Sequence, residues 1–228
     1  MANGDYLVTA CDICASIGEK SEDALYAPAM VVGAFTARTP LLELYAVGIT
    51  PLTGVVTIGG ESAPTGEKIL AGVYQEMDQV LPLTISTEKN MPTTMTSVGI
   101  SFHGVGQPIK VGGFKTGDEV WLVGHPCVGQ AVLHHQGDLL NIHTVKKLVE
   151  SEAVKEVLPV GSSGVLRECE DMVLADQASM HWFDHGLDLE ASAGPSTAAV
   201  VVCSPGGLPK VLIPCKQIGT IEKTRFSD

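Results

Sequence analysis

Aromatic side chains make up only 5% of this 228-residue chain, although 45% of its residues are hydrophobic. A core therefore has to be built from Val, Leu, Ile and Ala, which favours buried strands covered by helices. Basic residues are also scarce, because 14 Lys and Arg stand against 26 Asp and Glu and the formal net charge is −12. So acidic a chain is poorly suited to neutralising phosphates, and we expect no nucleic acid partner. It would also repel a free nucleoside triphosphate unless divalent cations mediate the contact.

Long apolar runs are absent as well. No stretch of about 18 uncharged apolar residues occurs, so we expect no membrane-spanning helix and no membrane partner. The N-terminal sequence lacks a basic flank followed by an apolar run, so it is not expected to be a signal peptide. The six cysteines are spread along the chain, which is typical of a reducing compartment and favours a cytoplasmic location.

Apolar segments alternate with turn signals along the chain. The expected strands are 6–11, 52–59, 84–88, 96–104, 119–124, 197–203 and 211–213, and the expected helices are 27–47, 65–81, 139–151 and 165–179. Pro40 lies inside the first helix, where it predicts a kink or a junction of two helices. A glycine-rich stretch at 112–117 separates the two halves. The sequence therefore predicts two α/β domains of comparable size, residues 1–112 and 113–228.

Three carboxylates occupy unusual positions in this pattern. Asp12 follows the apolar strand 6–11, Glu43 interrupts an apolar helix, and Glu88 closes the third expected strand. Such carboxylates are costly to bury unpaired, whereas Mg²⁺ takes oxygen ligands from separate elements. Together the three could hold Mg²⁺ that bridges the phosphates of ATP. Each acid taken alone could equally be a helix cap or a surface charge, so spacing does not decide the matter.

Other motifs point to a site less strongly. Cys11 and Cys14 have the Cys-x-x-Cys spacing of a zinc or redox site, but no second pair accompanies them, which favours two buried thiols. Two groups of histidines could suggest a metal site: His134, His135 and His143, and the i, i+4 pair His181 and His185. Surface or packing histidines are the simpler interpretation, because the zincin glutamate is missing. The segment 104–106, Gly-Val-Gly, is no dinucleotide fingerprint, because no helix start follows it.

Three segments resemble the superfamily of aminoimidazole ribonucleotide synthetase, thiamine-monophosphate kinase and selenophosphate synthetase. Residues 43–51, Glu-Leu-Tyr-Ala-Val-Gly-Ile-Thr-Pro, resemble that superfamily's helix-ending pattern of an acid, four residues and then Gly-Ala-x-Pro. Residues 86–88, Ser-Thr-Glu, fall where the family has Gly-Gly-Asp or Gly-Gly-Glu. Residues 115–124 resemble its junction strand, and Asp12 matches the acid at the end of its early strand.

Within the superfamily, the greatest likeness is to the α-ribazole kinases of cobalamin-salvaging bacteria, through segments 10–12, 35–38, 86–93, 158–164 and 187–197. This resemblance implies a synthetase-like fold of two domains, with an N-terminal mixed sheet and helices that form a dimer barrel and a C-terminal α/β domain. It also implies a homodimeric transferase that phosphorylates the 5′-hydroxyl of α-ribazole in cobalamin biosynthesis. Two alternatives stay open: another substrate such as a thiamine-type phosphate, and a nucleotide-binding relative without catalysis.

The resemblance also assigns roles to residues. The expected metal ligands are Asp12, Glu43 and Glu88, and the expected ATP contacts are Thr36, Lys89 and Asn90, with Lys89 and Arg38 as the catalytic cations on the phosphates. The expected substrate residues are Gly161, Ser162, Ser163, Ser192 and Gly194. Mg²⁺ would be the cofactor and ATP the co-substrate. The chain departs from the family in two of these places, because Glu43 replaces an Asp and the loop at 161–164 lacks the usual acid. The usual glycine-rich segment with paired aspartates before the first strand is also missing here or supplied from elsewhere.

Overall fold

In the computed structural model, which describes residues 4–107, 110–184 and 186–223, the chain divides into two units. The first consists of residues 1–45 and 49–107, and the second of residues 46–48 and 108–228. The main boundary therefore lies a few residues before the glycine-rich stretch in which the sequence places it. Within the described part of the chain, no helix is long and apolar enough to cross a membrane.

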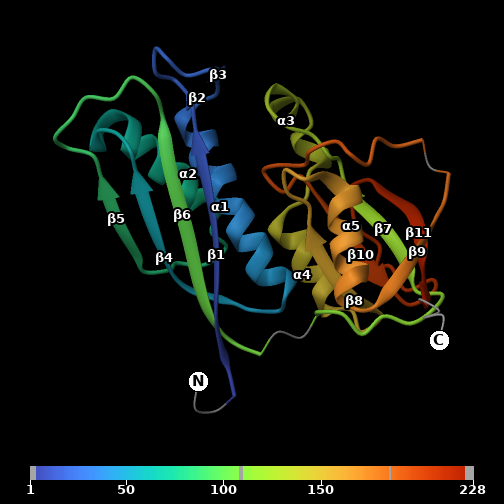
Figure 1. Cartoon of the computed structure of the whole chain (residues 1–228). Helices are drawn as coiled ribbons and strands as arrows, with labels where there is room; N and C mark the ends of the chain where they lie inside the picture. The colour runs from blue at the N-terminus through green and yellow to red at the C-terminus, as the bar shows by residue number, and fades with distance from the viewer. Residues whose placement is uncertain (1–3, 108–109, 185, 224–228) are drawn as a thin grey trace. The chain divides into compact units, whose positions relative to one another are not determined.

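The sheet of the first unit has the strand order β1-β6-β4-β5 (Figure 1). Its strands are β1 (Tyr6–Ala15), β4 (Pro51–Ile58), β5 (Leu83–Thr87) and β6 (Ser97–Gly106). Strands β1 and β4 pair antiparallel with β6, while β4 pairs parallel with β5. Strands β1, β4 and β5 therefore run in the same direction, and their carboxyl ends share one side, the carboxyl end of the sheet. The predicted mixed sheet is confirmed.

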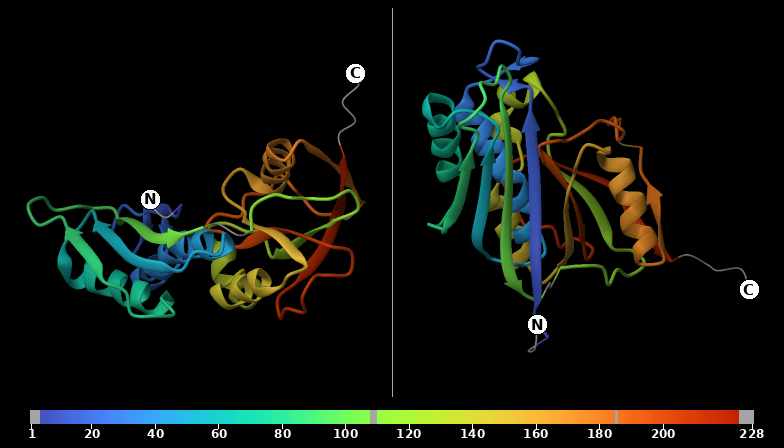
Figure 2. Two further views of the ribbon diagram at one scale, coloured as in Figure 1. Left: turned by 90° about the horizontal axis from the view of Figure 1, so that it is seen from below. Right: turned by 60° about the vertical axis from the view of Figure 1, so that its left-hand side comes forward.

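Side chains alternate between the two faces of this sheet. Along β6, Val98, Ile100 and Phe102 are buried, while the residues between them are partly exposed. Helices α1 (Ala29–Ala46) and α2 (Glu67–Glu76) cover the buried face (Figure 2). A π-helical turn η1 (Ser62–Gly66) leads into α2, and the short strands β2 (Ile17–Gly18) and β3 (Leu25–Tyr26) pair parallel in the segment after β1. The alternation thus builds one core between sheet and helices.

Helices α1 and α2 touch through their backbones. A Cβ atom added at Gly72 would lie 1.8 Å from the carbonyl oxygen of Met30, and one at Gly33 would lie 2.0 Å from that of Ile69. No side chain fits in either place, so glycine is required where the helices cross. Pro40 lies inside α1, which is one helix from Ala29 to Ala46 and not two helices meeting at the proline.

The second unit is built on a sheet of order β8-β10-β7-β11-β9, in which every pair is antiparallel. Its strands are β7 (Glu119–Gly124), β8 (Val154–Pro159), β9 (Ala178–Trp182), β10 (Ala198–Cys203) and β11 (Cys215–Lys223), and its helices are α3 (Gln130–His134), the 3₁₀ turn η2 (Gln136–Asp138), α4 (Ile142–Glu150) and α5 (Gly164–Ala175). All six residues of β10 are buried. This strand is therefore covered on both faces.

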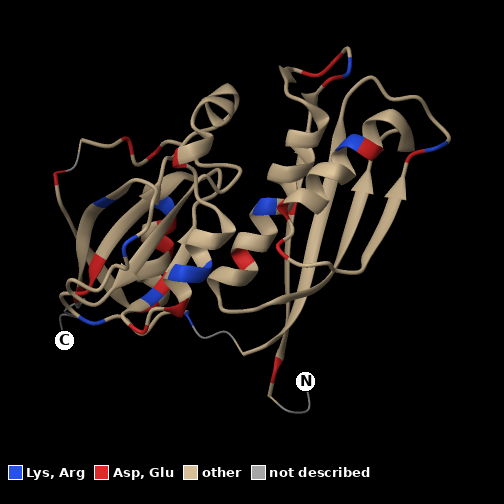
Figure 3. Cartoon of the chain, turned by 180° about the vertical axis from the view of Figure 1, so that it is seen from behind, with Lys and Arg blue, Asp and Glu red and all other residues tan. Residues whose placement is uncertain are grey.

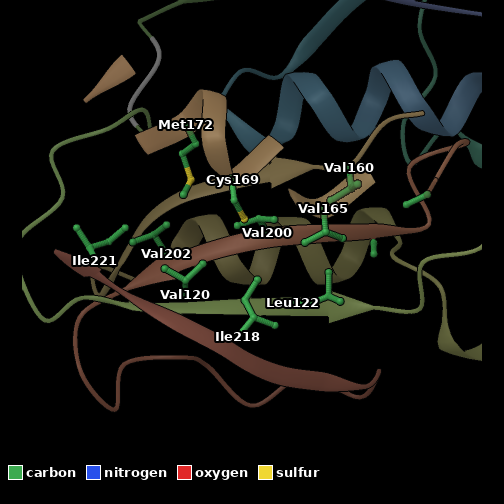
Figure 4. Packing of buried hydrophobic residues seen from close by; sticks show 12 residues of the cluster. Val120, Leu122, Val160, Val165, Cys169, Met172, Val200, Val202, Ile218 and Ile221 are labelled. Carbon is green, nitrogen blue, oxygen red and sulfur yellow. The ribbon is translucent and has the colours of Figure 1, made fainter. Parts of the chain in front are cut away.

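Helix α5 packs on the sheet of the second unit through its apolar face (Figure 4). Its buried residues Val165, Cys169 and Met172 belong to one cluster with Val200 and Val202 of β10 and with residues of β7 and β11. The 3–4-residue spacing of these α5 positions is the helical period, whereas the β10 positions alternate as in a strand. The two periods predict the strand and the start of the helix, but α5 ends at Ala175 and not at residue 179.

Several expected elements differ from the structure. The prediction of a strand at 211–213 is wrong, because these residues form a bend. The strand at this end of the sheet is instead β11, which pairs with β7 and β9. Strands β8 and β9 were not expected at all, and β9 begins where the expected helix 165–179 was to continue. The first strand does not end before Asp12, since its pairing with β6 continues to Ala15 opposite Ser97. Asp12 therefore lies inside β1.

Candidate functional site

Ligands of α/β sheets commonly bind outside the carboxyl ends of parallel strands. In the first unit three segments meet this condition: residues 16–23 after β1, residues 59–61 after β4, and residues 88–96 after β5. Of the three predicted acids, Glu88 lies in this region, whereas Asp12 lies inside β1, before the end of that strand at Ala15. The carboxyl end of the sheet is therefore the candidate site of the first unit.

Asp12 lies in β1 on the face that points toward α1. Its carboxylate accepts a hydrogen bond from the Ile13 amide at 2.8 Å. Burial raises the pKa of Asp12 above its ordinary value of 3.8, while the Ile13 amide and the Thr39 hydroxyl act in the opposite direction. The Asp12 carboxylate is thus partly desolvated, and no Lys or Arg is among the groups that shift its pKa.

Helix α1 places Thr39 beside Asp12 and Thr36 beside Cys14 of β1. Thr39 is buried, and its Oγ1 is a buried side-chain atom without a hydrogen-bond partner of normal geometry, although it lies near enough to Asp12 to lower the pKa of that carboxyl. Thr36 donates to the carbonyl oxygen of Val32 at 2.8 Å. Burial and the Asp12 charge raise the pKa of the Cys14 thiol to about 11. An unsatisfied hydroxyl beside a desolvated carboxylate is a polar pair that a ligand or cation could complete.

The predicted ATP contact Thr36 therefore lies in the same region as Asp12, but its hydroxyl is already bonded within α1. Glu43 lies four residues after Thr39, on the same side of α1 and one turn farther along. Its side chain is partly buried and takes part in an interaction of its own. Asp12 and Thr36 thus lie where β1 faces α1, while Glu43 lies one turn beyond Thr39 along α1.

Glu88 extends the β4–β5 pairing by one residue, because its amide donates to the Ile58 carbonyl oxygen at 2.9 Å. Its Oε1 accepts hydrogen bonds from the amides of Asn90 and Met91, at 2.6 and 3.1 Å. These bonds lower the pKa of Glu88. The carboxylate thereby closes a turn that presents Lys89 and Asn90 to solvent, where both predicted phosphate contacts are exposed.

Arg38 is paired within the first unit. Its Nε and Nη2 atoms donate to the two carboxylate oxygens of Glu76 at 2.7 and 2.9 Å, with side chains 17% and 12% exposed. The guanidinium also lies over the Phe35 ring, 4.3 Å from its centroid. A phosphate contact by Arg38 would have to break this two-pronged pair, so the geometry does not support the predicted catalytic role.

Replacing Arg38 by Met is therefore expected to lower the free energy of unfolding by about 3 kcal/mol, because it leaves a largely buried Glu76 carboxylate without its partner. The double variant R38M/E76Q should recover part of this loss. Urea unfolding of the single and double variants measures both effects. A single variant of wild-type stability that had lost nucleotide binding would instead favour the catalytic role.

The donor chemistry near Asp12 fits Mg²⁺, because carboxylate and hydroxyl oxygens are its preferred ligands. Among the described residues, however, no group of three or more His, Cys, Asp or Glu side chains is placed to hold a metal ion. The joint metal site of Asp12, Glu43 and Glu88 is thus not formed by these residues alone and stays a prediction. Mg²⁺ is commonly bound by one or two carboxylates together with substrate phosphates, so the orphan Thr39 hydroxyl and Asp12 fit a cation that arrives with ATP.

The predicted substrate segments lie together in the second unit. The Ala193 amide donates to the Gly161 carbonyl oxygen at 3.2 Å, and the Leu166 amide donates to that of Leu189 at 2.8 Å. Gly164 has φ +82°, and a Cβ there would meet the Glu190 carbonyl oxygen at 2.7 Å. The loop 161–164 at the start of α5 is therefore seated against residues 189–193.

The side chains of this loop pair differ in exposure. Ser162 and Ser163 are exposed, whereas Ser192 is partly buried and accepts a hydrogen bond from the Gly194 amide at 3.3 Å. The Gly161 amide is capped by Glu168 of α5, at 3.3 Å. Two exposed hydroxyls next to a helix start can accept or donate hydrogen bonds to a polar ligand. Their role as substrate residues stays a prediction.

Sequence reasoning missed a charged network at the carboxyl end of the first sheet. Lys20 binds Glu61, which directly follows Gly59 and Gly60, at an Nζ–Oε2 distance of 2.6 Å. The Lys20 partners Glu61 and Thr93 are far away in sequence, so no local period could reveal them. The only local signal was a Gly-Gly-Glu pattern directly after a strand.

The weaker motifs do not form sites among the described residues. Cys11 and Cys14 lie on opposite faces of β1, since Cys11 is exposed and Cys14 is near Thr36 of α1. The His135 ring packs on that of His125, with centroids 4.4 Å apart, and His143 is exposed. His185 lies outside the described residues, so its pairing with His181 has no structural account. Figure 3 shows Lys and Arg positions scattered among Asp and Glu positions in each unit.

These features define the class of protein by fold: a mixed four-stranded sheet with two helices on one face, followed by an antiparallel sheet with helices. No family model and no curated protein sequence matches the chain. Among solved structures, the hydrogenase maturation protein HypE of E. coli is similar with a TM-score of 0.69 and 14% identity, over 98% of this chain and 82% of HypE.

Two further similar structures were solved with nucleotides. The structure of AaThiL complexed with AMPPCP and TMP has a TM-score of 0.64 and 12% identity, over 96% of this chain and 82% of that one. The structure of T. maritima PurL complexed with ATP has a TM-score of 0.58 and 16% identity, over 96% of this chain and 36% of that one. At such identities the likeness establishes the fold. It confirms the synthetase-like fold, whereas the likeness to α-ribazole kinases stays a prediction.

Proposed function

We propose that the chain is an ATP-dependent phosphotransferase for a small nucleoside-like alcohol, and that α-ribazole, phosphorylated at its 5′-hydroxyl for cobalamin biosynthesis, is its substrate. The observation that carries the proposal is the partly desolvated Asp12 carboxylate inside β1, beside a buried Thr39 hydroxyl that has no hydrogen bond of normal geometry. The fold likeness to a kinase and to PurL, each solved with a nucleotide, supports it.

Phosphoryl transfer needs positioning and electrostatic stabilisation more than covalent chemistry. Asp12 and Thr39 would offer oxygens on the side of α1, and Glu43 would add its carboxylate one turn away. On the side of β5, the turn closed by Glu88 would present Lys89 and Asn90 to the phosphate oxygens. Mg²⁺ bound with ATP would supply neutralisation of the phosphate charge, which the acidic chain requires.

The second unit would hold the acceptor. The exposed hydroxyls of Ser162 and Ser163, together with Ser192, Gly161 and Gly194, would offer polar groups to it at the start of α5. Such groups match the hydroxyls of a ribose, each of which both donates and accepts.

We further propose that the enzyme is a cytoplasmic homodimer formed through the first sheet. Strand β1 lies at the edge of this sheet, and the face away from α1 exposes large apolar side chains, with Leu7 64% and Ile13 72% exposed. Exposed apolar side chains on a long edge strand favour association. A second copy would cover them.

The direct test is incubation of the purified protein with ATP, Mg²⁺ and α-ribazole, followed by chromatographic detection of α-ribazole 5′-phosphate and ADP. The wild type should form both products in equal amounts. The variant E88Q should lose most of the turnover while keeping its turn, because a glutamine Oε1 can accept the same two amide hydrogen bonds. If E88Q turned over as fast as the wild type, Glu88 would have no role in the reaction.

The same assay separates the alternatives. Turnover of another riboside or of thiamine monophosphate, but not of α-ribazole, would overturn the substrate and keep the reaction. A wild type that releases heat on titration with Mg-ATP but forms no product from any of these acceptors would be the nucleotide-binding relative without catalysis, and a wild type that releases no heat at millimolar Mg-ATP would have lost nucleotide binding as well. The pairing of Arg38 with Glu76 and the use of Glu88 in its own turn are the observations that keep this second candidate open.

A further inference from the structure

The Lys20 side chain ties together all three segments at the carboxyl end of the first sheet. Lys20 belongs to the segment after β1 and is only 11% exposed. Its Nζ donates to Glu61 Oε2 at 2.6 Å, to Thr93 Oγ1 at 2.8 Å and to the Thr93 carbonyl oxygen at 3.0 Å. All three of its donors are used. One ammonium group therefore joins the segments that follow β1, β4 and β5.

The surrounding backbone is shaped for this ammonium group. A Cβ added at Gly60 would lie 3.1 Å from Lys20 Nζ and 3.3 Å from Thr93 Oγ1, so glycine leaves the room that these groups occupy. Glu61 also accepts a hydrogen bond from Thr65, and these two partners lower the pKa of Glu61 to about 2. The lowered pKa keeps the Glu61 carboxylate ionised at neutral pH, where it pairs with the Lys20 ammonium.

A second set of hydrogen bonds joins the segment after β1 to the loop 88–96. Asp23 accepts hydrogen bonds from the amide and the hydroxyl of Thr96, both at 2.7 Å, and from the Lys20 amide at 2.8 Å. Two backbone hydrogen bonds, from Ser16 to Thr96 at 2.9 Å and from Glu22 to Thr94 at 3.0 Å, join them further. The far part of the loop 88–96 is thus fixed to the segment after β1, whereas its near part carries Glu88, Lys89 and Asn90.

We propose that Lys20, through Thr93 and Glu61, is a positioning residue that holds the loop 88–96 in the conformation that binds the phosphates of ATP. The inference rests on the proposed function, since it concerns the loop that would contact the nucleotide. Lys20 itself contacts no phosphate, because its three donors are occupied. Its effect is to raise the fraction of molecules in which the loop is ready to bind.

This role predicts a particular kinetic signature. A ligand that binds only one loop conformation has an apparent dissociation constant that is inversely proportional to the population of that conformation. Loss of the contact should therefore raise KM for ATP while kcat at saturating ATP stays nearly unchanged. A merely structural loss would reduce the fraction of folded enzyme, which lowers kcat and leaves KM as it was.

The experiment compares K20M with K68M. Lys68 forms an ion pair with Glu19 at 2.8 Å, but its side chain is 51% exposed and its partner lies outside the loop 88–96. We expect about a tenfold rise of KM for ATP in K20M and none in K68M. Hydrogen exchange of the amides in 88–96 should accelerate in K20M only.

If K20M fails to fold, the variants T93V and T93S test the same contact from the side of Thr93. T93V removes one acceptor of the Lys20 ammonium at similar volume, and T93S restores it. KM for ATP should rise about threefold in T93V and return in T93S, since one of the three contacts is lost and regained. Unchanged KM and unchanged exchange in both K20M and T93V would overturn the inference.

Failure of the proposed function would be seen separately, in the wild type. If the wild type neither binds nor turns over ATP, hydrogen exchange alone decides the inference. Faster exchange across 88–96 in K20M would then support Lys20 as the residue that positions this loop, and unaltered exchange would refute it.

Discussion

The variant D12N is expected to lose ATP turnover by about a hundredfold or more while its free energy of unfolding at neutral pH stays equal to that of the wild type or rises. Turnover falls because the Asp12 carboxylate is the charged group of the proposed site. Stability does not fall, because an asparagine Oδ1 can keep the Ile13 amide bond without the cost of a partly buried charge.

The pH dependence of stability follows from the sign of the Asp12 shift. Burial raises the pKa of Asp12 above 3.8, so the folded state favours the protonated carboxyl. The resulting stabilisation is complete below the ordinary pKa and is lost as the pH rises through the raised value. Other carboxyls with lowered pKa values, such as Asp23 and Glu61, act in the opposite direction, so the measure is the difference in urea midpoint between the wild type and D12N. From pH 3 to pH 7 the wild type should lose stability relative to D12N.

Asp23 provides a matched control with the opposite sign. Burial alone would raise its pKa, but hydrogen bonds from Thr96 and Lys20 lower it below 3.8. D23N should therefore destabilise the protein at neutral pH. A D12N protein that is clearly less stable than the wild type would show that Asp12 is held by structural partners and not poised for a ligand.

The second large effect is expected for Gly72→Ala. Its methyl group would have to occupy a point 1.8 Å from the Met30 carbonyl oxygen and 2.8 Å from the Ala34 amide nitrogen. Both are backbone atoms of α1, so the two helices must separate. We expect a loss of about 3 kcal/mol or more, the upper end of overpacking costs, although alanine in an open helix position would stabilise by about 1 kcal/mol.

Chemical unfolding followed by circular dichroism measures this loss. Gly137→Ala is the control, because a Cβ there meets no atom within 4 Å and should leave stability nearly unchanged. If G72A were as stable as the control, the close crossing of α1 and α2 could not be a feature of the folded protein in solution.

Elements with a clean period were predictable from the sequence. The alternation of β6 and the apolar run of β10 gave correct strands, and the resemblance gave the fold. Strand β11 was missed because its pairing with β7 shifts register between Gln217 and Gly219, which interrupts the alternation. Strand β9 was missed because its partner β11 stabilises it, which no local pattern reveals.

The candidate site was predictable only in part. Carboxylates beside apolar segments single out Asp12 and Glu88 in the sequence, but their hydrogen bonds do not follow from it, and Asp12 lies inside β1. Their role as metal ligands stays a prediction. Arg38 is expected at the phosphates because a cation must reach their oxygens, whereas the structure pairs it with Glu76, 38 residues away. Lys20 was overlooked for the same reason, since its partner Thr93 is 73 residues away. Long-range pairs of this kind follow from topology and not from local sequence.

The position of β7 between β10 and β11 has a consequence for biosynthesis. Residues 119–124 leave the ribosome long before either neighbouring strand, which are residues 198–203 and 215–223. Both hydrogen-bonding edges of the nascent strand stay unpaired until β10 and β11 have been translated. Such non-local pairing is slow and exposes the chain to aggregation, so the C-terminal half should depend more on chaperones than the N-terminal half does.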